Sequence, residues 1–422
     1  MSDRELLVYV DLAGVAHLVG RLWARRARNR ESASFEYDAN WLANPARFAL
    51  EPALMLGGGP QHTQQSRALF GAFGDSAPDR WGRNLIQRDE RRRAQEEGRA
   101  PRSLGEVDYL LGVSDIARQG ALRFKESTDA PFLASGDGAN VPPLIRLGEL
   151  LKAAMRVSAD GDDDSDLRLI LAPGSSLGGA RAKASVLDLQ GQLSIAKFPQ
   201  SDDIYPVMQW EAVALDLACR AGIAVPTWRL EQVADRTALL LRRFDRVGDI
   251  RIPFLSAMSM LGAADNEDHS YLEIVDALRQ FGSQPEQDCA ELWRRIVFNI
   301  LISNTDDHLR NHGFLYESAG GWRLSPAYDM NPTPGDVKAR ALSLAIDEAD
   351  DTASLDVALS MARQCGLKQP AANEIIGEVQ AAVTQWRACA KTHGLNSRDI
   401  ARMASAFEHE QSRTCAVLAP HT

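Results

Sequence analysis

A dense polar stretch of this chain reads Ile302-Ser303-Asn304-Thr305-Asp306-Asp307-His308-Leu309-Arg310-Asn311-His312. It follows the apolar run Ile296 to Ile302, which predicts a buried helix or strand. A turn-rich segment, Ser325-Pro326-Ala327-Tyr328-Asp329-Met330-Asn331-Pro332, supplies a further carboxylate at Asp329. Carboxylate and amide oxygens are the ligands that Mg²⁺ prefers. The two loops therefore predict a shared site for a divalent cation together with phosphate.

Length and composition indicate an ordinary globular protein. The chain has 422 residues, of which 45% are hydrophobic and 25% charged, so it is long enough for about two or three domains. A net charge of −10 does not favour nucleic-acid binding by the protein as a whole, although a local basic patch remains compatible with it. The segment Met1 to Glu5 is largely charged and no long apolar core follows it. We therefore expect neither a signal peptide nor a transmembrane helix, and a cytoplasmic location.

The cysteines are widely spaced and form no C-x-x-C pair. They are Cys219, Cys289, Cys365, Cys389 and Cys415. An odd number without paired spacing favours a reducing compartment and predicts no zinc site.

Apolar periodicity changes along the chain. Leu6 to Val10 and Val15 to Leu22 predict an opening antiparallel sheet, which Phe35 to Tyr37 could extend. A helix is expected around Leu147 to Met155, and the acidic stretch Ser158 to Asp166 is expected to be a surface loop. After Gly248 the pattern favours helices, over Tyr271–Phe281, Ala290–Ile302, Ser354–Cys365, Ala371–His393 and Ser397–Phe407.

A glycine-rich stretch carries the second chemical signal, and it reads Pro173-Gly174-Ser175-Ser176-Leu177-Gly178-Gly179-Ala180-Arg181. Glycines let successive N–H groups point at one anion. A β-rich run, a turn at Gly191 and a second strand ending at Lys197 follow it. This layout is typical of a protein-kinase nucleotide lobe rather than a Walker A loop, whose lysine lies within the loop itself. Alone, the glycine loop is a weak signal, and an ordinary hairpin turn is the alternative.

Two further segments fit the same layout. Glu211 lies in the expected helix Trp210 to Ala221, where a kinase places the acid that pairs with its strand lysine. An exposed glutamate in a first helical turn is the alternative. Ala238 to Leu241 predicts a buried strand that continues into a polar connector through Arg246, where a nucleotide base could bond to the backbone.

The order of these signals suffices for phosphoryl transfer. Asp306 would accept or orient the substrate hydroxyl, Asn311 and Asp329 would hold metal, and Lys197 would steady the phosphates. Asp306 and Asn311 are five residues apart (311 − 306), as in the kinase catalytic loop. The H-R-D and D-F-G motifs are absent, which excludes an ordinary eukaryotic-type kinase.

The glycine loop, residues 304–312 and residues 324–329 together resemble the HipA toxin kinases of bacterial type II toxin–antitoxin systems. The resemblance implies an α+β, protein-kinase-like, two-lobed fold. A mixed, β-rich N-terminal lobe would span residues 1–247, with the opening sheet subdomain to about residue 105. An all-helical C-terminal lobe would span residues 248–422. The implied activity is that of a serine/threonine kinase that uses ATP and Mg²⁺.

Motif positions imply roles for individual residues. Asp306 would be the catalytic base and Lys197 the ATP-phosphate lysine, and Ser176 would be both an ATP contact and the autophosphorylation site. Whether Ser175 or Ser185 is also phosphorylated stays open, as does the role of Asp307. The implied magnesium ligands are Asn311 and Asp329, which also contact ATP. Arg243 and Phe244 would lie in the hinge. The further implied ATP contacts, with these two, are Gly178, Gly179, Ala180, Lys183, Arg243, Phe244 and His308.

The resemblance also implies partners and regulation. Phosphate on Ser176 would place about two negative charges in a phosphate-binding loop and switch the enzyme off. The implied partners are a HipB-type DNA-binding antitoxin, DNA through that antitoxin, and an aminoacyl-tRNA synthetase as substrate. Ala182 stands where many relatives are expected to have proline, which should loosen the loop without abolishing it. Arg242 stands where some relatives have a hinge acid, with little expected effect on ATP binding.

Two other functions remain open on the sequence. One is a pseudokinase that binds nucleotide or antitoxin without phosphoryl transfer. The other is a metal-dependent nuclease built on Asp306, Asp307, His308 and His312, which would leave the glycine loop and Lys197 unexplained.

Overall fold

The structure is a computed structural model that describes residues 4–27, 30–64, 67–135, 141–159, 161, 163–171, 181–265, 267–317, 320–337, 340–348 and 350–413. The chain forms two compact units. Unit 1 comprises Met1–Ser201 and Gln232–Leu255, and unit 2 comprises Asp202–Glu231 and Ser256–Thr422. The division expected after residue 247 differs from this one, chiefly because helix α7 (Val207–Arg220) belongs to unit 2.

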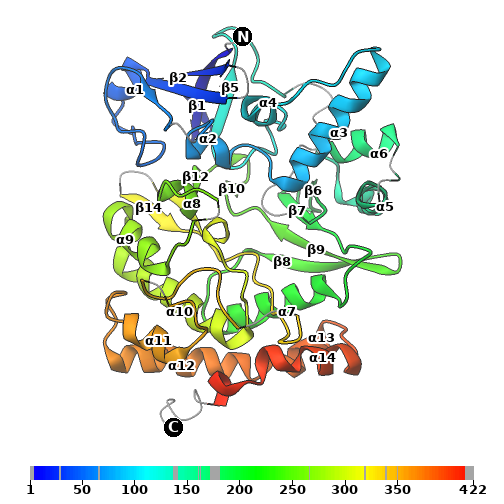
Figure 1. Cartoon of the computed structure of the whole chain (residues 1–422), viewed down its shortest axis with the longest axis vertical. Coiled ribbons are helices and arrows are strands. Elements are labelled where there is room, and N and C mark those ends of the chain that lie inside the picture. The colour runs from blue at the N-terminus through cyan, green and yellow to red at the C-terminus, as the bar shows by residue number, and fades with distance from the viewer. Residues whose placement is uncertain are drawn as a thin grey trace. The chain divides into compact units, whose positions relative to one another are not determined.

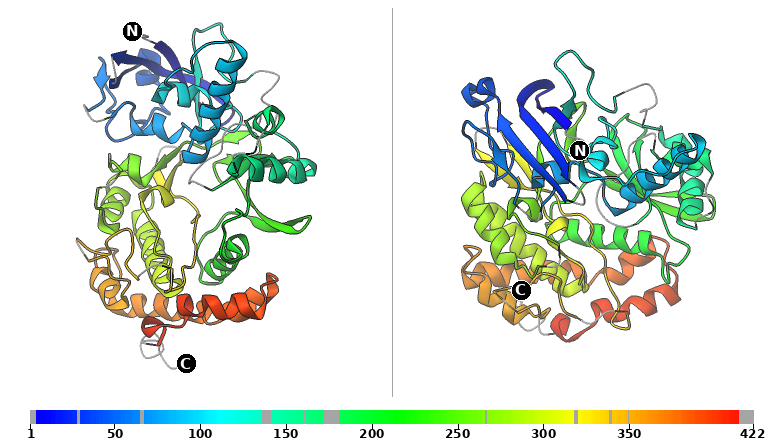
Figure 2. Two further views of the ribbon diagram at one scale, coloured as in Figure 1. Left: turned by 45° about the vertical axis from the view of Figure 1, so that its right-hand side comes forward. Right: turned by 45° about the horizontal axis from the view of Figure 1, so that its top comes forward.

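The opening sheet of unit 1 has five strands in the order β4-β3-β2-β1-β5. Its long strands β1 and β2 are joined by a tight turn in which Ala13 and Gly14 have φ of 52° and 83°. Figure 2 shows these strands in dark blue. The sequence prediction of an opening antiparallel sheet is confirmed. The strands are β1 (Arg4–Leu12), β2 (Val15–Ala27), β3 (Arg30–Tyr37), β4 (Gln61–His62) and β5 (Leu122–Lys125).

A second sheet carries the predicted strand lysine. Its strand order is β6-β7-β9-β8, and the predicted hairpin is confirmed as the antiparallel pair β6–β7 with Gly191 at φ 73° in its turn. Leu150, Val186 and Phe198 lie in the core between this sheet and the adjoining helices. These elements are β6 (Lys183–Leu187), β7 (Leu193–Lys197), β8 (Trp228–Val233), β9 (Arg236–Arg242), α3 (Arg80–Glu96), α5 (Leu147–Ser158) and α6 (Asp164–Leu171).

The acidic stretch that was expected to be a surface loop ends in a helix. The prediction was wrong for its last residues, because α6 begins at Asp164. The side chain of Asp163 accepts a hydrogen bond from the backbone N–H of Asp166 at 3.0 Å, which satisfies a donor of the first helical turn. Leu167 and Ile170 then bury the apolar side of α6 in the core of unit 1. Capping and burial together outweigh the repulsion among the acids.

Unit 1 contains several shorter elements as well. They are α1 (Ala39–Ala43), α2 (Gly71–Asp75), α4 (Glu106–Leu111), the 3-10 turn η1 (Leu144–Arg146), β10 (Arg246–Val247) and β11 (Ile250–Arg251), with β12 (Phe254–Ser256) at the boundary between the units.

Unit 2 is built around α10, as Figure 1 shows. This helix begins with Pro285 and two first-turn acids, Glu286 and Asp288, which suit a helix N-terminus. It packs against α9, α11, α12 and α14. The helices are α7 and α8 (Ala257–Met260), α9 (Tyr271–Phe281), α10 (Pro285–Ile302), α11 (Leu355–Met361), α12 (Gln369–Val383), α13 (Trp386–Thr392) and α14 (Ser397–Phe407), with the 3-10 turn η2 (Leu309–Asn311).

The helices predicted for this unit are present, although α10 begins before the expected Ala290 and α11 ends at Met361 instead of Cys365. The single helix expected over Ala371–His393 is two helices, α12 and α13, separated by Thr384 and Gln385. An antiparallel hairpin, β13 (Gly313–Glu317) and β14 (Gly321–Leu324), also lies among the helices, so the unit is mostly but not wholly helical. Among the described residues, no helix has both the length and the apolar character needed to cross a membrane.

Candidate active site

The polar stretch begins where α10 ends. Ser303 closes the helix in the left-handed conformation, with φ of 55°, and turns the chain sharply. The backbone N–H of Asn304 then donates to the carbonyl of Asn299 at 2.9 Å. The side chain of Asn304 donates to the side-chain oxygen of Asn299 at 3.0 Å. The loop is therefore fixed to the buried end of a long helix.

The two adjacent acids of this loop have opposite environments. Asp306 is exposed, whereas Asp307 is only 4% exposed. The side-chain nitrogen of Asn311 donates to the backbone carbonyl of Asp306 at 3.1 Å. This hydrogen bond closes the loop between Asp306, the predicted catalytic base, and Asn311, a predicted metal ligand. Asp306 is thus the acid of the pair that can reach a substrate.

Asp307 is the centre of a buried hydrogen-bond network. Its Oδ2 accepts from Tyr271 Oη at 2.5 Å, from Asn299 Nδ2 at 2.9 Å and from His312 Nε2 at 2.9 Å. Burial alone would raise the pKa of Asp307, but His312 and Tyr271 hold the pKa of this carboxyl below its usual range. Burial beside Asp307 raises the pKa of Tyr271 well above its ordinary value. Asp307 and His312 are thus occupied inside the protein, which argues against a nuclease built on both.

Sequence reasoning missed Asn299 and the hydroxyl of Tyr271. A signal was present, because Asn299 is the one amide in the run Ile296 to Ile302. A buried amide must find hydrogen-bond partners. An amide within an apolar helix end therefore indicates a polar network, although not which residues complete it.

The second loop, around Asp329, is tied to the first. The backbone N–H of Asn331 donates to Asn304 Oδ1 at 3.2 Å, and that of Thr333 donates to the carbonyl of Ser303 at 3.1 Å. Asp329 has a φ of 61°, a left-handed conformation that is unusual for a residue other than glycine. Such strained residues cluster at functional sites. The structure thus brings the predicted metal-binding loops into one bonded assembly within unit 2.

Several oxygen atoms of these loops suit a hard cation. The amide nitrogen of Asn311 is engaged by Asp306, which leaves its Oδ1 as the atom able to bind a cation. Asn331 Nδ2 lies 3.4 Å from Asp329 Oδ1, while Asn331 Oδ1 is buried without a hydrogen-bond partner in the described part of the chain. Carboxylate and amide oxygens are suitable magnesium ligands. The donor set therefore fits Mg²⁺.

His308 lies within the same loop and is partly buried. Its backbone carbonyl accepts from the N–H of Asn311 at 2.8 Å, which supports the turn η2. Its ring Nδ1 is buried and has no partner among the described residues. The main chain of His308 thus braces the loop, and its ring Nδ1 is a buried polar atom that no described residue pairs with.

Lys197 and Lys183 face each other across the β6–β7 hairpin of unit 1. Lys197 is partly exposed at the end of β7, whereas Lys183 is 1% exposed. Lys183 Nζ pairs with Asp79 Oδ2 at 2.8 Å, and Asp79 also caps α3 by accepting from the N–H of Gly82 at 2.7 Å. Burial raises the pKa of Asp79, and Lys183 opposes that rise. The predicted ATP contact at Lys183 thus falls on a buried, paired ammonium group.

Replacing Lys183 by methionine should lower the free energy of unfolding by about 1–3 kcal/mol, because Asp79 then loses a buried partner. Urea unfolding measures this change. The exposed Lys152 of α5 is the matched control, and Lys152→Met should change stability by less than about 0.5 kcal/mol. Equal stability of the two variants would contradict a structural role for Lys183.

The predicted hinge residues lie just after β9. The guanidinium of Arg243 is buried and donates to Asp245 Oδ1 at 2.6 Å and to the carbonyl of Ala117 at 2.8 Å. Burial would raise the pKa of Asp245, but Arg243 and Arg246 hold that pKa well below its usual range. Phe244 packs near Phe254, with ring centroids 6.2 Å apart. The side chain of Arg243 therefore anchors the connector.

The glycine-loop predictions lie outside the described residues. They are Ser175, Ser176, Gly178, Gly179 and Ala180. Ser185 is described, and it is buried on β6 with 1% exposure.

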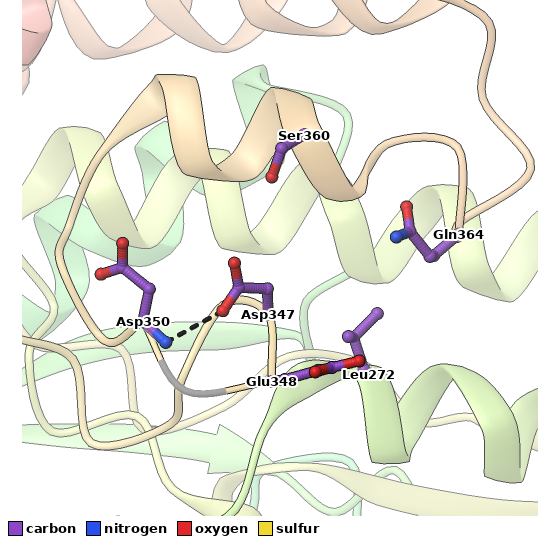
Figure 3. A pocket seen from close by; sticks show the side chains of 6 residues that line it. All are labelled: Leu272, Asp347, Glu348, Asp350, Ser360 and Gln364. Atoms are coloured by element: carbon purple, nitrogen blue, oxygen red, sulfur yellow. Dashed lines mark hydrogen bonds between the residues drawn. The ribbon is translucent and has the colours of Figure 1, made fainter.

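A surface pocket of about 650 Å³ lies in unit 2, and Figure 3 shows it between α9 and α11. The backbone N–H of Asp350 donates to Asp347 Oδ1 at 2.9 Å within its wall. Its lining contains none of the predicted site residues, so the candidate active site is the loop assembly and not this pocket. The lining residues are Leu272, Asp347, Glu348, Asp350, Ser360 and Gln364.

The fold defines a kinase-like α+β protein. HipA of Shewanella oneidensis, solved with HipB and its operator DNA, matches 98% of this chain and 96% of that chain with a TM-score of 0.68. At 15% sequence identity this likeness shows the fold alone. Residues 175–386 match the family model of the HipA-like C-terminal domain, and residues 10–100 match that of the HipA N-terminal domain. The chain belongs to the HipA family.

Curated relatives match only in part. Y4mE of Sinorhizobium fredii, named as a candidate kinase, is 25% identical over 184 residues, which are 37% of this chain and 42% of the relative. A Haemophilus influenzae protein, also named as a candidate kinase, is 34% identical over 85 residues, which are 19% of this chain and 25% of that protein. The match thus spans less than half the length of either relative.

Proposed function

We propose that this protein is an ATP- and Mg²⁺-dependent serine/threonine kinase. The observation that carries the proposal is that Asp307 is buried and hydrogen-bonded while the adjacent Asp306 is exposed. Asp307 fixes the loop from inside, and Asp306 is exposed on the same loop, closed onto Asn311 by a 3.1 Å hydrogen bond. A positioned carboxylate can accept the proton of a substrate hydroxyl as that oxygen attacks phosphorus.

The remaining roles follow the chemistry of the side chains. Asn311 and Asp329 would hold Mg²⁺, and the unpartnered Oδ1 of Asn331 would supply a further oxygen. When bound, Mg²⁺ offsets negative charge on the phosphates. Lys197 would pair with phosphate oxygens, and the His308 ring would donate to the bound nucleotide. The backbone near Phe244 would contact the base.

We further propose that this kinase acts as the toxin of a toxin–antitoxin pair. HipA family membership supports this, as does the structural likeness to a HipA solved with HipB and operator DNA. The partner would be a HipB-type antitoxin, through which DNA is bound indirectly. The substrate would be a translation component, an aminoacyl-tRNA synthetase, and phosphorylation of Ser176 would inactivate the kinase.

Incubation of the full chain with γ-labelled ATP and Mg²⁺, alone and with purified synthetases, tests the proposal. Mass spectrometry should place phosphate on Ser176 and on a serine or threonine of one synthetase. Label on Ser176 alone would support the kinase activity and contradict the proposal that a synthetase is the substrate. Nucleotide binding without any transfer would identify a pseudokinase instead.

A further inference from the structure

Unit 2 contains a second cluster of possible metal ligands, on α7 and at the end of α13. Within the described part of the chain, Asp216, Cys389 and His393 form the one group of acid, cysteine or histidine side chains with metal-site spacing. One oxygen of Asp216, the Cys389 sulfur and one His393 ring nitrogen all lie within 4.8 Å of one another. None of these residues belongs to the proposed kinase machinery. We propose that they form a binding site for Zn²⁺.

The positions of the three side chains follow from the helices. Cys389 and His393 are four residues apart, so they lie on the same side of α13 and its C-terminal cap. Asp216 reaches them from α7, which packs against α13. The C-terminal end of a helix favours a cation. Ligands from two helices therefore meet where the backbone also attracts positive charge.

The ligand atoms converge on one oxygen. Asp216 Oδ2 lies 2.9 Å from Cys389 Sγ and 3.2 Å from His393 Nε2. Thiolate, imidazole and carboxylate bind zinc with bonds of about 2.0–2.3 Å. A small rotation of these side chains would open room for one ion between the three atoms. Three protein ligands leave a fourth position for water, which completes a tetrahedron.

Arg220 is the charged neighbour that a metal must accommodate. Its Nε donates to Asp216 Oδ1 at 2.9 Å, and its second contact reaches Oδ2 at 3.2 Å. Oδ1 can therefore stay with Arg220 while Oδ2 turns to the ion. A hydrogen-bonded partner of this kind orients a ligating carboxylate.

Binding must release one proton. Cys389 Sγ lies 2.9 Å from Asp216 Oδ2, and a carboxylate oxygen can only accept, so the thiol carries its proton in the metal-free protein. On binding, the thiol proton leaves to solvent and the thiolate coordinates the ion. The proton that His393 Nε2 donates to Asp216 must also leave that nitrogen, and it is replaced by one that Nδ1 takes from solvent, so that Nε2 can coordinate the ion with no further net release.

The side chains leave a path for an ion. The Asp216 side chain is 21% exposed and the His393 side chain is 14% exposed, while Cys389 is buried. Trp228 covers the imidazole edge-on, with ring centroids 5.3 Å apart. A bound ion would clamp α7 to α13 and stabilise unit 2 against unfolding.

The experiment uses the full chain, stripped of metal with a chelator and then titrated with Co²⁺ and with Zn²⁺. Co²⁺ should produce a thiolate-to-cobalt charge-transfer band and the visible bands of a tetrahedral ion, at one ion per chain. Zn²⁺ should displace Co²⁺ and raise the melting temperature. In competition with a chelating dye, Cys389→Ser and His393→Gln should bind Zn²⁺ about tenfold more weakly or worse.

The matched control is Cys219→Ser, since Cys219 is an exposed cysteine of the same helix α7 as Asp216. This variant should bind as the unmodified chain does. A folded unmodified chain without the thiolate-to-cobalt band would overturn the site, and this measurement needs no variant. A band lost in Cys219→Ser and kept in Cys389→Ser would assign metal binding to the surface thiol and would also overturn it.

Discussion

Replacing Asp306 by alanine is expected to reduce phosphoryl transfer by about 10²- to 10⁴-fold, the usual contribution of a positioned general base. Asp306 is exposed and its side chain is not needed for the loop-closing bond, because Asn311 donates to its backbone carbonyl. The variant should therefore fold normally. The initial rate of transfer from γ-labelled ATP gives the effect, and thermal unfolding checks the fold.

Asp276→Ala is the matched control for this measurement. Asp276 lies on α9 of the same unit, and its side chain is 79% exposed. Its replacement should leave the rate of transfer and the melting temperature nearly unchanged. Transfer by Asp306→Ala at a rate close to that of the unmodified chain would refute the assignment of Asp306 as base.

Replacing Asp307 by alanine is expected to lower the free energy of unfolding by about 3–5 kcal/mol, the usual loss when one partner of a buried pair is removed. All three donors, from Tyr271, Asn299 and His312, converge on its Oδ2. Alanine removes this acceptor from all three donors in the interior, and Asn299 Nδ2 keeps only the longer contact to Tyr271 Oη at 3.4 Å. Chemical unfolding in urea measures the difference.

Asp307→Asn separates hydrogen bonding from charge. An amide oxygen in the place of Oδ2 can still accept from the same donors, but neutral hydrogen bonds are weaker than charged ones. We therefore expect a loss of stability well below that of Asp307→Ala. The rate of phosphoryl transfer by the folded fraction should also fall. Asp306 directly precedes Asp307, so weaker bonds at Asp307 hold the catalytic base less firmly. Equal stability of the alanine variant and the unmodified chain would contradict the anchoring role.

The pH dependence of stability provides a second test of the same carboxylate. The pKa of Asp307 is lowered in the folded protein, so its stabilising contribution is fully present at neutral pH and above about pH 4. That contribution is lost as the pH falls from about 4 through the lowered folded pKa. Asp307→Asn has no titrating group there, and its stability should fall less over this acid range.

The sequence determined the elements of this protein to a large extent. Short runs of β-type apolar residues predicted β1 and β2, and helical periodicity predicted α9 and α14 with their observed bounds. These predictions succeeded because local periodicity matches the side of each element that becomes buried. The family motifs, spread from the glycine loop to Asp329, also indicated the kinase-like class.

Tertiary structure decided what periodicity could not. The cap from Asp163 and the burial of Leu167 and Ile170 turned the end of an acidic stretch into α6. The break between α12 and α13 was not predicted, because the apolar pattern continues across it, with Val383 and Trp386 both buried. The fold also placed His393 and Cys389 against Asp216, a proximity that their separation along the chain does not indicate.

The adjacent acids Asp306 and Asp307 show most clearly what the sequence pattern cannot predict. From the sequence, only the five-residue interval to Asn311 favours Asp306 over Asp307, because the residue type and position of neighbours in a loop hardly differ. Only the fold buries Asp307 beside Tyr271 and His312 and leaves Asp306 exposed. The sequence by itself thus determined the elements and the kinds of side chain available. The tertiary structure decided which carboxylate faces solvent, because burial and hydrogen-bond partners come from residues distant along the chain.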